Sequence, residues 1–313
     1  MKKFRIIITI ILFLLTLGLG YGVYYLGKTN IKLDKEYNKL NSDLINLNNE
    51  IKNNDNSSSI IKENIDKLNN IENIIIEKQN TVYKLGAELE KKIKAGNTNY
   101  KIAYLTFDDG PYYNTFKVFE VLKKYDVKAT FFTTNTNSTK CWDKKDYNCQ
   151  EIYPYYIKYG HTLANHTYTH KLSSNAIYKT ETRFKSELTQ QADLIKSKTN
   201  GYVPNIMRFP GGSNQPKDYS LGESNITKLK NVAYSLGYGW VDWTAQDGDG
   251  GNLNSKETAR NNFKGSINEN IEVVLFHDYS NITTPLLPEF IKYLEDRNYI
   301  LLPLFYESVM VNK

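Results

Sequence analysis

The sequence predicts an α/β fold from residue 100 onward, either a parallel β/α barrel or a doubly wound sheet. Short apolar segments alternate there with amphipathic ones, which is typical of strand and helix repeats. Candidate polar residues fall repeatedly at the ends of the predicted strands. Parallel strands bring their carboxyl ends to one edge of the sheet, so this placement favours the barrel.

The elements of this part follow from the apolar patterning in order along the chain. We expect strands where β-branched and aromatic residues run together, at 102–107, 129–133, 206–209, 240–243, 272–276 and 299–304. We expect helices where apolar residues recur every three or four positions, at 116–125, 182–198, 226–236 and 286–297.

The N-terminal end predicts a membrane anchor. Residues 6–26 form a run of 21 residues without a charge. As a helix this run would span about 31 Å, the thickness of a bilayer core. Flanking Lys and Arg residues favour a cytoplasmic N-terminus and an exported remainder. A cleaved signal peptide is the alternative, but its apolar region is usually shorter and no Ala-x-Ala-like site follows Leu26.

A polar segment separates the anchor from the α/β part. Apolar residues recur at spacings of four and three, first at 33–51 and again at 68–89, with an Asn/Ser-rich interruption at 53–59. This periodicity is typical of a coiled coil. The segment is predicted to be a helical stalk that either pairs with a second copy in a homodimer or folds back as a hairpin. A partly disordered polar linker is the alternative.

The distribution of charge limits the classes of partner, and the two cysteines offer a possible disulfide. Residues 1–99 carry 15 Lys and Arg against 11 Asp and Glu, so only +2 of the formal net charge of +6 falls on the remaining residues. No dense basic face is expected, and nucleic acid is therefore not expected as a partner. The two cysteines, Cys141 and Cys149, lie in one polar stretch, where they form either a disulfide closing a surface loop or two free thiols.

The segment TFDDGP at 106–111 places two adjacent carboxylates, Asp108 and Asp109, at the end of a predicted buried strand. Neighbouring side chains of a strand point in opposite directions, so one acid could bind a metal while the other transfers protons. An Asp-Gly turn with solvated acids is the simpler interpretation of this segment alone.

Histidines supply the partners for such a metal. His166 and His170 are four residues apart, a spacing that puts both imidazoles on one face of a helical turn. With one carboxylate they complete a ligand set that leaves positions open for water and substrate. His277 ends the run VVLF and is either a strand-end histidine bonded to backbone or a general acid facing the metal. His161 is expected to be structural.

Two further segments end predicted strands. Arg208 begins RFPGG, where the guanidinium could clamp a carboxylate and the glycines allow close approach of backbone to a ligand. Trp243 begins WTAQDGD and adds an aromatic platform and more acids.

Together these segments resemble the five motifs of the polysaccharide deacetylases, the NodB-homology proteins or carbohydrate esterase family 4. TFDDGP, NHTYTH, RFPGG, the W-x5-D segment and VVLFHD occur in the family's order between about residues 100 and 305. The resemblance implies a distorted (β/α)7-type barrel that removes acetyl groups from polysaccharides with a divalent metal. Zn²⁺ is the expected ion, with Co²⁺ or another divalent ion as alternatives.

The resemblance also implies roles for the residues named above. The implied metal ligands are Asp109, His166 and His170; the implied general base is Asp108 and the general acid His277. Arg208 would orient Asp108, and Asp249 would tune His277 or Arg208, although Gly250 stands where many members have a Trp. Other acids that could replace Asp249 are Asp242 and Asp247. The N–H of Gly211 would contribute to an oxyanion hole, and further substrate contacts are expected at Pro111, Tyr112 and Trp243.

The expected organisation is a cytoplasmic tip and transmembrane anchor at 1–27, a stalk at 28–98 and a deacetylase domain at 99–313. Its expected substrate is N-acetylglucosamine of cell-wall peptidoglycan, and the free amines would give lysozyme resistance. The expected location is the cell membrane, single-pass, with the enzyme domain facing the wall. The alternatives are a deacetylase of another glycan, such as poly-N-acetylglucosamine, a chitooligosaccharide or an O-acetylated polymer, and a non-catalytic wall-binding scaffold.

Overall fold

The computed structural model describes residues 80–135, 149–172, 177–199, 201–215, 222–306 and 308. The chain divides into two compact units, Met1–Leu89 and Glu90–Lys313. The predicted anchor lies outside the described residues, and of the predicted stalk only residues 80–98 are described, with 80–94 helical. Within the described ranges, no helix is both long enough and apolar enough to cross a bilayer.

The second unit is built on a parallel sheet whose described strands follow the order β5-β4-β3-β2-β1-β7-β6, with β8 beside β1. These strands are β1 (Lys101–Gly110), β2 (Thr130–Thr133), β3 (Thr162–Asn165), β4 (Ile206–Met207), β5 (Gly239–Trp240), β6 (Ala245–Gln246), β7 (Ile271–His277) and β8 (Tyr299–Leu302). In the described residues β5 and β6 do not pair with each other, so the sheet curls into a half-barrel without closing. The predicted parallel α/β architecture is confirmed in this distorted, open form.

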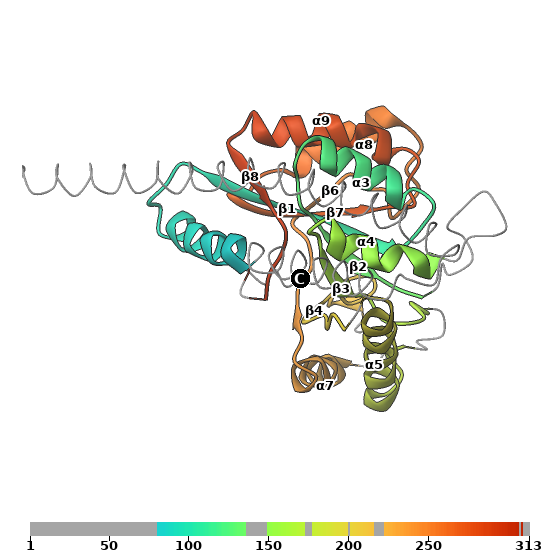
Figure 1. The fold of residues 1–313 in the computed structure, drawn as a ribbon. Helices are drawn as coiled ribbons and strands as arrows, with labels where there is room; N and C mark the ends of the chain where they lie inside the picture. The colour runs from blue at the N-terminus through green and yellow to red at the C-terminus, as the bar shows by residue number, and fades with distance from the viewer. Residues whose placement is uncertain are drawn as a thin grey trace, which may run out of the picture. The chain divides into compact units, whose positions relative to one another are not determined.

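Helices cover the sheet in two groups (Figure 1). The first group is α3 (Thr115–Lys124), α8 (Lys256–Ser266) and α9 (Thr283–Glu295), which pack on one another. The second is α5 (Glu181–Lys198) and α7 (Gly222–Ser235), which contact each other and the β3–β5 end of the sheet. The short η1 (Cys149–Ile152) and α4 (Tyr153–Lys158) lead into β3.

Strand β1 is the centre of the sheet because it pairs with three strands. β7 runs along one edge of it from Ile102 to Asp108. The other edge is shared: β8 pairs with residues 101–104 and β2 with residues 106–110. The run from Ile102 to Phe107 is buried as a result, which explains why the sequence there is apolar without alternation.

Aromatic side chains fill the space between the sheet and its helices. Phe107 of β1 stacks on Phe131 of β2 at 5.0 Å between ring centroids, and Phe276 of β7 lies 5.6 Å from Phe107. A second cluster lies under α5 and α7, where Phe184 stacks on Phe209 at 5.3 Å. These two clusters hold the strand ends in fixed relative positions.

Several predicted elements differ from those observed. β4 and β5 are two residues long, so the predicted strands at 206–209 and 240–243 end earlier than expected. The structure also contains α4, β3, β6 and α8, which the patterning did not predict. α4, β3 and β6 are too short for local hydrophobic periodicity to mark them. α8 is mostly polar, with Ala259 and Phe263 as its buried residues. Cys149 is disulfide-bonded, and Cys141, the other cysteine of the sequence, lies outside the described residues.

Candidate active site

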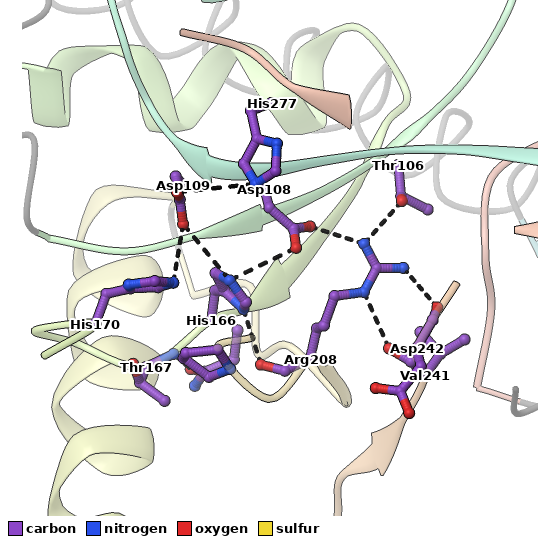
Figure 2. A network of polar contacts seen from close by, with 12 residues as sticks. Thr106, Asp108, Asp109, His166, Thr167, His170, Arg208, Val241, Asp242 and His277 are labelled. Atoms are coloured by element: carbon purple, nitrogen blue, oxygen red, sulfur yellow. Dashed lines mark hydrogen bonds and ion pairs between the residues drawn. The ribbon is translucent and has the colours of Figure 1, made fainter. Parts of the chain in front are cut away.

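The carboxyl end of β1 turns two adjacent carboxylates toward one point. The register between β1 and β2 shifts between Asp108 and Gly110, and Asp109 at this irregularity has a φ of 70°. A regular strand would send the two side chains to opposite faces, but a bulge redirects the side chain at the extra residue. His166 Nε2 therefore lies 3.6 Å from Asp108 Oδ2 and 3.5 Å from Asp109 Oδ1 (Figure 2).

The two histidines reach this point from a loop. The prediction of a helical turn at 166–170 is wrong: β3 ends at Asn165, and Thr167 and His170 have φ values of 67° and 49°. Asn165 Oδ1 accepts the N–H of Thr167 at 2.9 Å, a local bond that competes with helix formation. The loop still brings the two imidazoles together, with ring centroids 4.9 Å apart, and places His170 Nε2 3.2 Å from Asp109 Oδ1.

Asp109, His166 and His170 form a donor set that fits a divalent metal. One ligand atom from each lies within 4.8 Å of the others. His166 Nδ1 donates to the carbonyl oxygen of Arg208 at 2.8 Å, which leaves the lone pair on Nε2, the nitrogen nearest both carboxylates. Burial lowers the pKa of His166 to about 3, so the ring is neutral, as a metal ligand must be. Two imidazoles and one carboxylate are typical of catalytic zinc sites.

Arg208 follows β4 directly and is fully buried. Its Nη1 donates to Asp108 Oδ1 and Thr106 Oγ1, both at 2.8 Å. Its Nε and Nη2 donate to the backbone oxygens of Val241 and Asp242 at 3.0 and 2.9 Å. A guanidinium bonded on all sides cannot rotate away, so it fixes the orientation of the Asp108 carboxylate (Figure 2).

The surroundings of Asp108 set its basicity. Burial raises the pKa of Asp108, and the positive charge of Arg208 opposes that rise. The net result is a raised pKa, which makes this carboxylate a better proton acceptor than a surface aspartate. Phe132 lies under the Arg208 guanidinium, 4.2 Å from ring centroid to Cζ, and adds a cation–π contact that favours its charge.

His277 ends β7 on the other side of the site and is held by Asp249. Its backbone N–H donates to Asp249 Oδ2 at 2.8 Å and its Nδ1 to Oδ1 at 2.7 Å. Its Nε2 lies 4.0 Å from Asp109 Oδ2. Burial alone would lower the pKa of His277, but the hydrogen bond and charge of Asp249 raise it to about 9. The imidazolium is therefore the stable form at neutral pH.

The three acids that the sequence left as alternatives occupy different places. Asp249 contacts His277 directly. Asp242 Oδ1 accepts the N–H of Ser213 at 2.8 Å, and Asp247 Oδ2 accepts the hydroxyl of Thr283 at 2.6 Å. The geometry therefore places Asp249 at the histidine, whereas Asp242 accepts a hydrogen bond from Arg208 at its backbone oxygen.

Gly250 follows Asp249 at the position where many family members have a Trp, and the surrounding structure explains why a small residue stands here. A Cβ at position 250 would lie 2.6 Å from Cε1 of His277. The His277 ring therefore packs against the backbone of Gly250, and a larger residue requires that ring or the loop to move.

The remaining predicted residues border the same site. Gly211 is exposed with a φ of 76°, and its N–H makes no hydrogen bond within the described residues. Trp243 fills the space beside Gly212, where a Cβ would lie 3.2 Å from the indole. Pro111 is buried and Tyr112 half-buried at the end of β1.

Glu187 is a site residue that the sequence analysis missed. It is fully buried in α5, where its Oε2 accepts the N–H of Thr169 at 2.7 Å and its Oε1 accepts the Thr169 hydroxyl at 2.8 Å. Arg183, one turn earlier in α5, forms a salt bridge with Glu187, with 2.6 Å between Nη2 and Oε1. Glu187 thereby fixes the loop between the two histidines. The available signal was its place on the buried face of α5, between Phe184 and Leu188.

Comparison with known proteins identifies the family to which the chain is similar. The family model for polysaccharide deacetylase matches residues 95–230. A putative polysaccharide deacetylase of Bacillus subtilis, YheN, is 32% identical over 208 residues, 65% of this chain and 67% of the relative. A peptidoglycan-N-acetylglucosamine deacetylase of Bacillus cereus is 28% identical over 237 residues, 72% of this chain and 79% of the relative.

Among solved structures, the catalytic domain of a peptidoglycan N-acetylglucosamine deacetylase from Eubacterium rectale is similar. The TM-score is 0.60 at 36% sequence identity, over 68% of this chain and 92% of that chain.

Proposed function

Because this chain belongs to the polysaccharide deacetylase family of hydrolases, we propose that it removes acetyl groups from N-acetylglucosamine of cell-wall peptidoglycan and releases acetate. The single observation that carries this proposal is the convergence of a metal-ligand triad, a buried basic carboxylate and a protonated histidine at one point. Relatives whose names specify peptidoglycan N-acetylglucosamine support the choice of substrate.

The proposed metal is zinc, held by Asp109, His166 and His170. When bound, it would polarise the acetamide carbonyl and lower the pKa of the attacking water. Two nitrogen ligands and one oxygen ligand suit zinc better than magnesium or calcium, which prefer oxygen.

The residues around the triad then divide the proton transfers. Asp108, basic through burial and held by Arg208, accepts the proton of the attacking water. The N–H of Gly211, which has no bond within the described residues, is available to the developing oxyanion. His277 donates a proton to the leaving nitrogen, so that the sugar amine departs neutral and acetate is formed.

The N-terminal part sets the proposed location. We propose that residues 1–27 anchor the protein in the cell membrane and that residues 28–98 form a stalk that carries the enzyme domain to the wall, where the stalk can pair with a second copy. The charge-free run at 6–26 and the heptad-like spacing after it support this arrangement. Deacetylation would add positive charge to the wall, and we propose lysozyme resistance as the result.

The experiment uses the full chain, stripped of metal and reloaded with zinc or cobalt. Acetate release is followed from purified peptidoglycan and from N-acetylglucosamine oligomers side by side, with Asp108→Asn as the control for background hydrolysis. Metal-dependent release from peptidoglycan is the expected result. Release only from free oligomers would move the target to another glycan, and no release from either with metal bound would favour a wall-binding scaffold.

Lysozyme resistance has its own measurement. Free glucosamine in wall hydrolysates and lysis by lysozyme are compared between cells with and without the protein. Equal glucosamine content in the two would contradict the role in the wall.

A further inference from the structure

Three tyrosines gather beside the proposed active site. Tyr112 and Tyr113 follow β1, and Tyr279 follows β7. The ring of Tyr112 lies 4.6 Å from that of Tyr113 and 5.9 Å from that of Tyr279. All three are half-buried. We refer to Tyr112, Tyr113 and Tyr279 as the tyrosine shelf.

The tyrosine shelf is not an extension of the hydrophobic core. Neither of the core clusters found in the described residues includes any of its rings, as a buried member or as a partly buried neighbour. Half-buried aromatic side chains that do not pack into a core are typical of ligand-binding surfaces, where the ring offers an apolar face and the hydroxyl a polar edge.

Hydrogen bonds between the two loops hold the shelf in place. The hydroxyl of Tyr113 and the side-chain amide of Asn114 both donate to the backbone oxygen of Tyr279, each at 3.4 Å. The same amide donates to Asn281 Oδ1 at 3.1 Å, and Asn114 is buried. The shelf is therefore assembled before any ligand arrives, so binding to it would cost little conformational entropy.

The shelf adjoins the proton donor of the proposed reaction. The ring of Tyr279 lies 5.0 Å from that of His277, whose Nε2 lies 4.0 Å from Asp109. The shelf is therefore within reach of a sugar next to one whose acetamide meets the metal-ligand triad.

We propose that the tyrosine shelf is a sugar-binding subsite that stacks against the pyranose ring next to the sugar being deacetylated. A pyranose has an apolar face of C–H groups that matches the face of a tyrosine ring, while its hydroxyls match the polar edges of the loops. This inference rests on the proposed function and deepens it: the protein would require a chain of at least two sugars for full activity.

The test compares Tyr279→Ala with Tyr279→Phe in the full zinc-loaded chain. KM and kcat are measured on N-acetylglucosamine oligomers of increasing length, and hydrolysis of p-nitrophenyl acetate, which has no sugar, is measured in parallel. Tyr279→Ala should raise KM about tenfold on the longer oligomers, which corresponds to the loss of one aromatic stacking contact. Tyr279→Phe should keep the KM of the unchanged protein, because the ring and not the hydroxyl makes the contact.

Two controls accompany this comparison. Tyr234→Ala removes a 60% exposed tyrosine of α7, whose ring lies 4.8 Å from that of Trp240 in β5, and it should leave KM unchanged. Tyr112→Ala tests the shelf from its other loop, and its effect should match that of Tyr279→Ala. An equal loss of p-nitrophenyl acetate and oligomer hydrolysis in Tyr279→Ala would overturn the proposal, because Tyr279 would then only position His277.

Binding separates this proposal from the proposed function. Affinity for a five-sugar N-acetylglucosamine oligomer is measured by calorimetry in the Asp108→Asn background, with and without Tyr279→Ala. If Tyr279→Ala weakens binding while the unchanged protein releases no acetate, the result supports the shelf and contradicts the proposed deacetylase activity. Acetate release with affinity and KM unaffected by Tyr279→Ala would contradict the shelf alone.

Discussion

Asp249 accepts two hydrogen bonds from His277. Its Oδ2 accepts the backbone N–H at 2.8 Å, and its Oδ1 accepts the Nδ1–H at 2.7 Å. The first bond fixes the end of β7, and the second fixes the tautomer and plane of the ring. Nε2 is therefore the nitrogen that faces the site, 4.0 Å from Asp109 Oδ2. One carboxylate thus determines where the proton donor points and how strongly it holds its proton.

Asp249→Asn should move the alkaline limb of the pH–rate profile to lower pH. His277 has a pKa raised to about 9, so a proton donor at this position is charged at neutral pH and is lost as pH rises through about 9. The amide keeps the shape, but it removes the charge that raises the pKa and leaves one of the two His277 N–H groups without an acceptor. We expect kcat to fall about 10²-fold at neutral pH, within the usual contribution of a general acid.

The measurement is kcat for acetate release between pH 6 and pH 10 on one substrate. Asp296→Asn, an exposed acid paired with Lys292, is the control and should leave the profile unchanged. Superimposable alkaline limbs for Asp249→Asn and the unchanged protein would show that this bond does not set the pKa of the donor.

The sequence placed most of these side chains at the site because each directly follows or ends a strand. Asp108 follows the buried run that ends at Phe107, and His277 ends the run VVLF. In a parallel sheet, being at the carboxyl end of any strand is enough to put residues far apart in sequence next to one another. The resemblance to the family motifs implies the pairing of Arg208 with Asp108, and the hydrogen bond between them joins residues 100 positions apart.

What the sequence could not predict depends on conformation or on distant partners. The spacing of His166 and His170 predicted a helical turn, but two left-handed residues and the Asn165 side chain produce a loop with the same outcome. The position of Glu187 on the buried face of α5 can be read from the sequence, but its partner, the Thr169 loop, is brought to it only by the tertiary fold. The choice of Asp249 among three acids likewise depends on where a glycine-rich loop crosses β7, which no local pattern encodes.

A zinc-binding assay should distinguish substitutions of the metal ligands from substitutions of the proton-transfer residues. Asp109→Ala and His166→Ala each remove a donor of the triad, so both should lose bound zinc and all turnover. Asp108→Asn and His277→Ala remove no donor of the triad, so both should keep zinc but lose about 10²–10⁴-fold in kcat. Zinc per protein after dialysis is measured by mass spectrometry alongside acetate release. Loss of zinc from Asp108→Asn or His277→Ala would contradict their assignment outside the triad.

Glu187→Gln should weaken metal binding without touching a ligand. The glutamine keeps the volume but replaces one accepting oxygen with a donor facing Thr169, so the loop between the histidines loses its anchor. Groups hydrogen-bonded directly to a metal ligand typically contribute 10- to 100-fold in metal affinity, and we expect about 10-fold for Glu187, which acts through Thr169. Competition with a chromophoric chelator gives the affinity. Glu181→Gln, an exposed acid at the start of α5, is the matched control and should bind zinc as tightly as the unchanged chain.

A final prediction concerns His161, which is buried away from the metal. Its ring stacks on Phe119 at 5.3 Å, its Nδ1 accepts the N–H of Ala129 at 3.3 Å, and its Nε2 has no partner in the described residues. Burial holds the pKa of His161 well below its usual 6.5, with the charge of Lys128 adding to the effect. The folded chain thus keeps the ring neutral where the unfolded chain protonates it.

The sign of the pH dependence follows from this difference. A depressed folded pKa contributes stability that is fully present above about pH 6.5 and is lost as pH falls below it, by up to about 1.4 kcal/mol per pH unit. His161→Gln keeps an acceptor for Ala129 but does not titrate. We expect the variant to be less stable than the unchanged protein at pH 7.5. The difference in unfolding free energy between the two should shrink as pH falls toward 5, because only the unchanged protein loses stability through this residue. Urea unfolding of metal-free samples at several pH values measures both curves. Parallel curves would mean that His161 titrates alike in both states, which its aromatic surroundings and unpartnered nitrogen argue against.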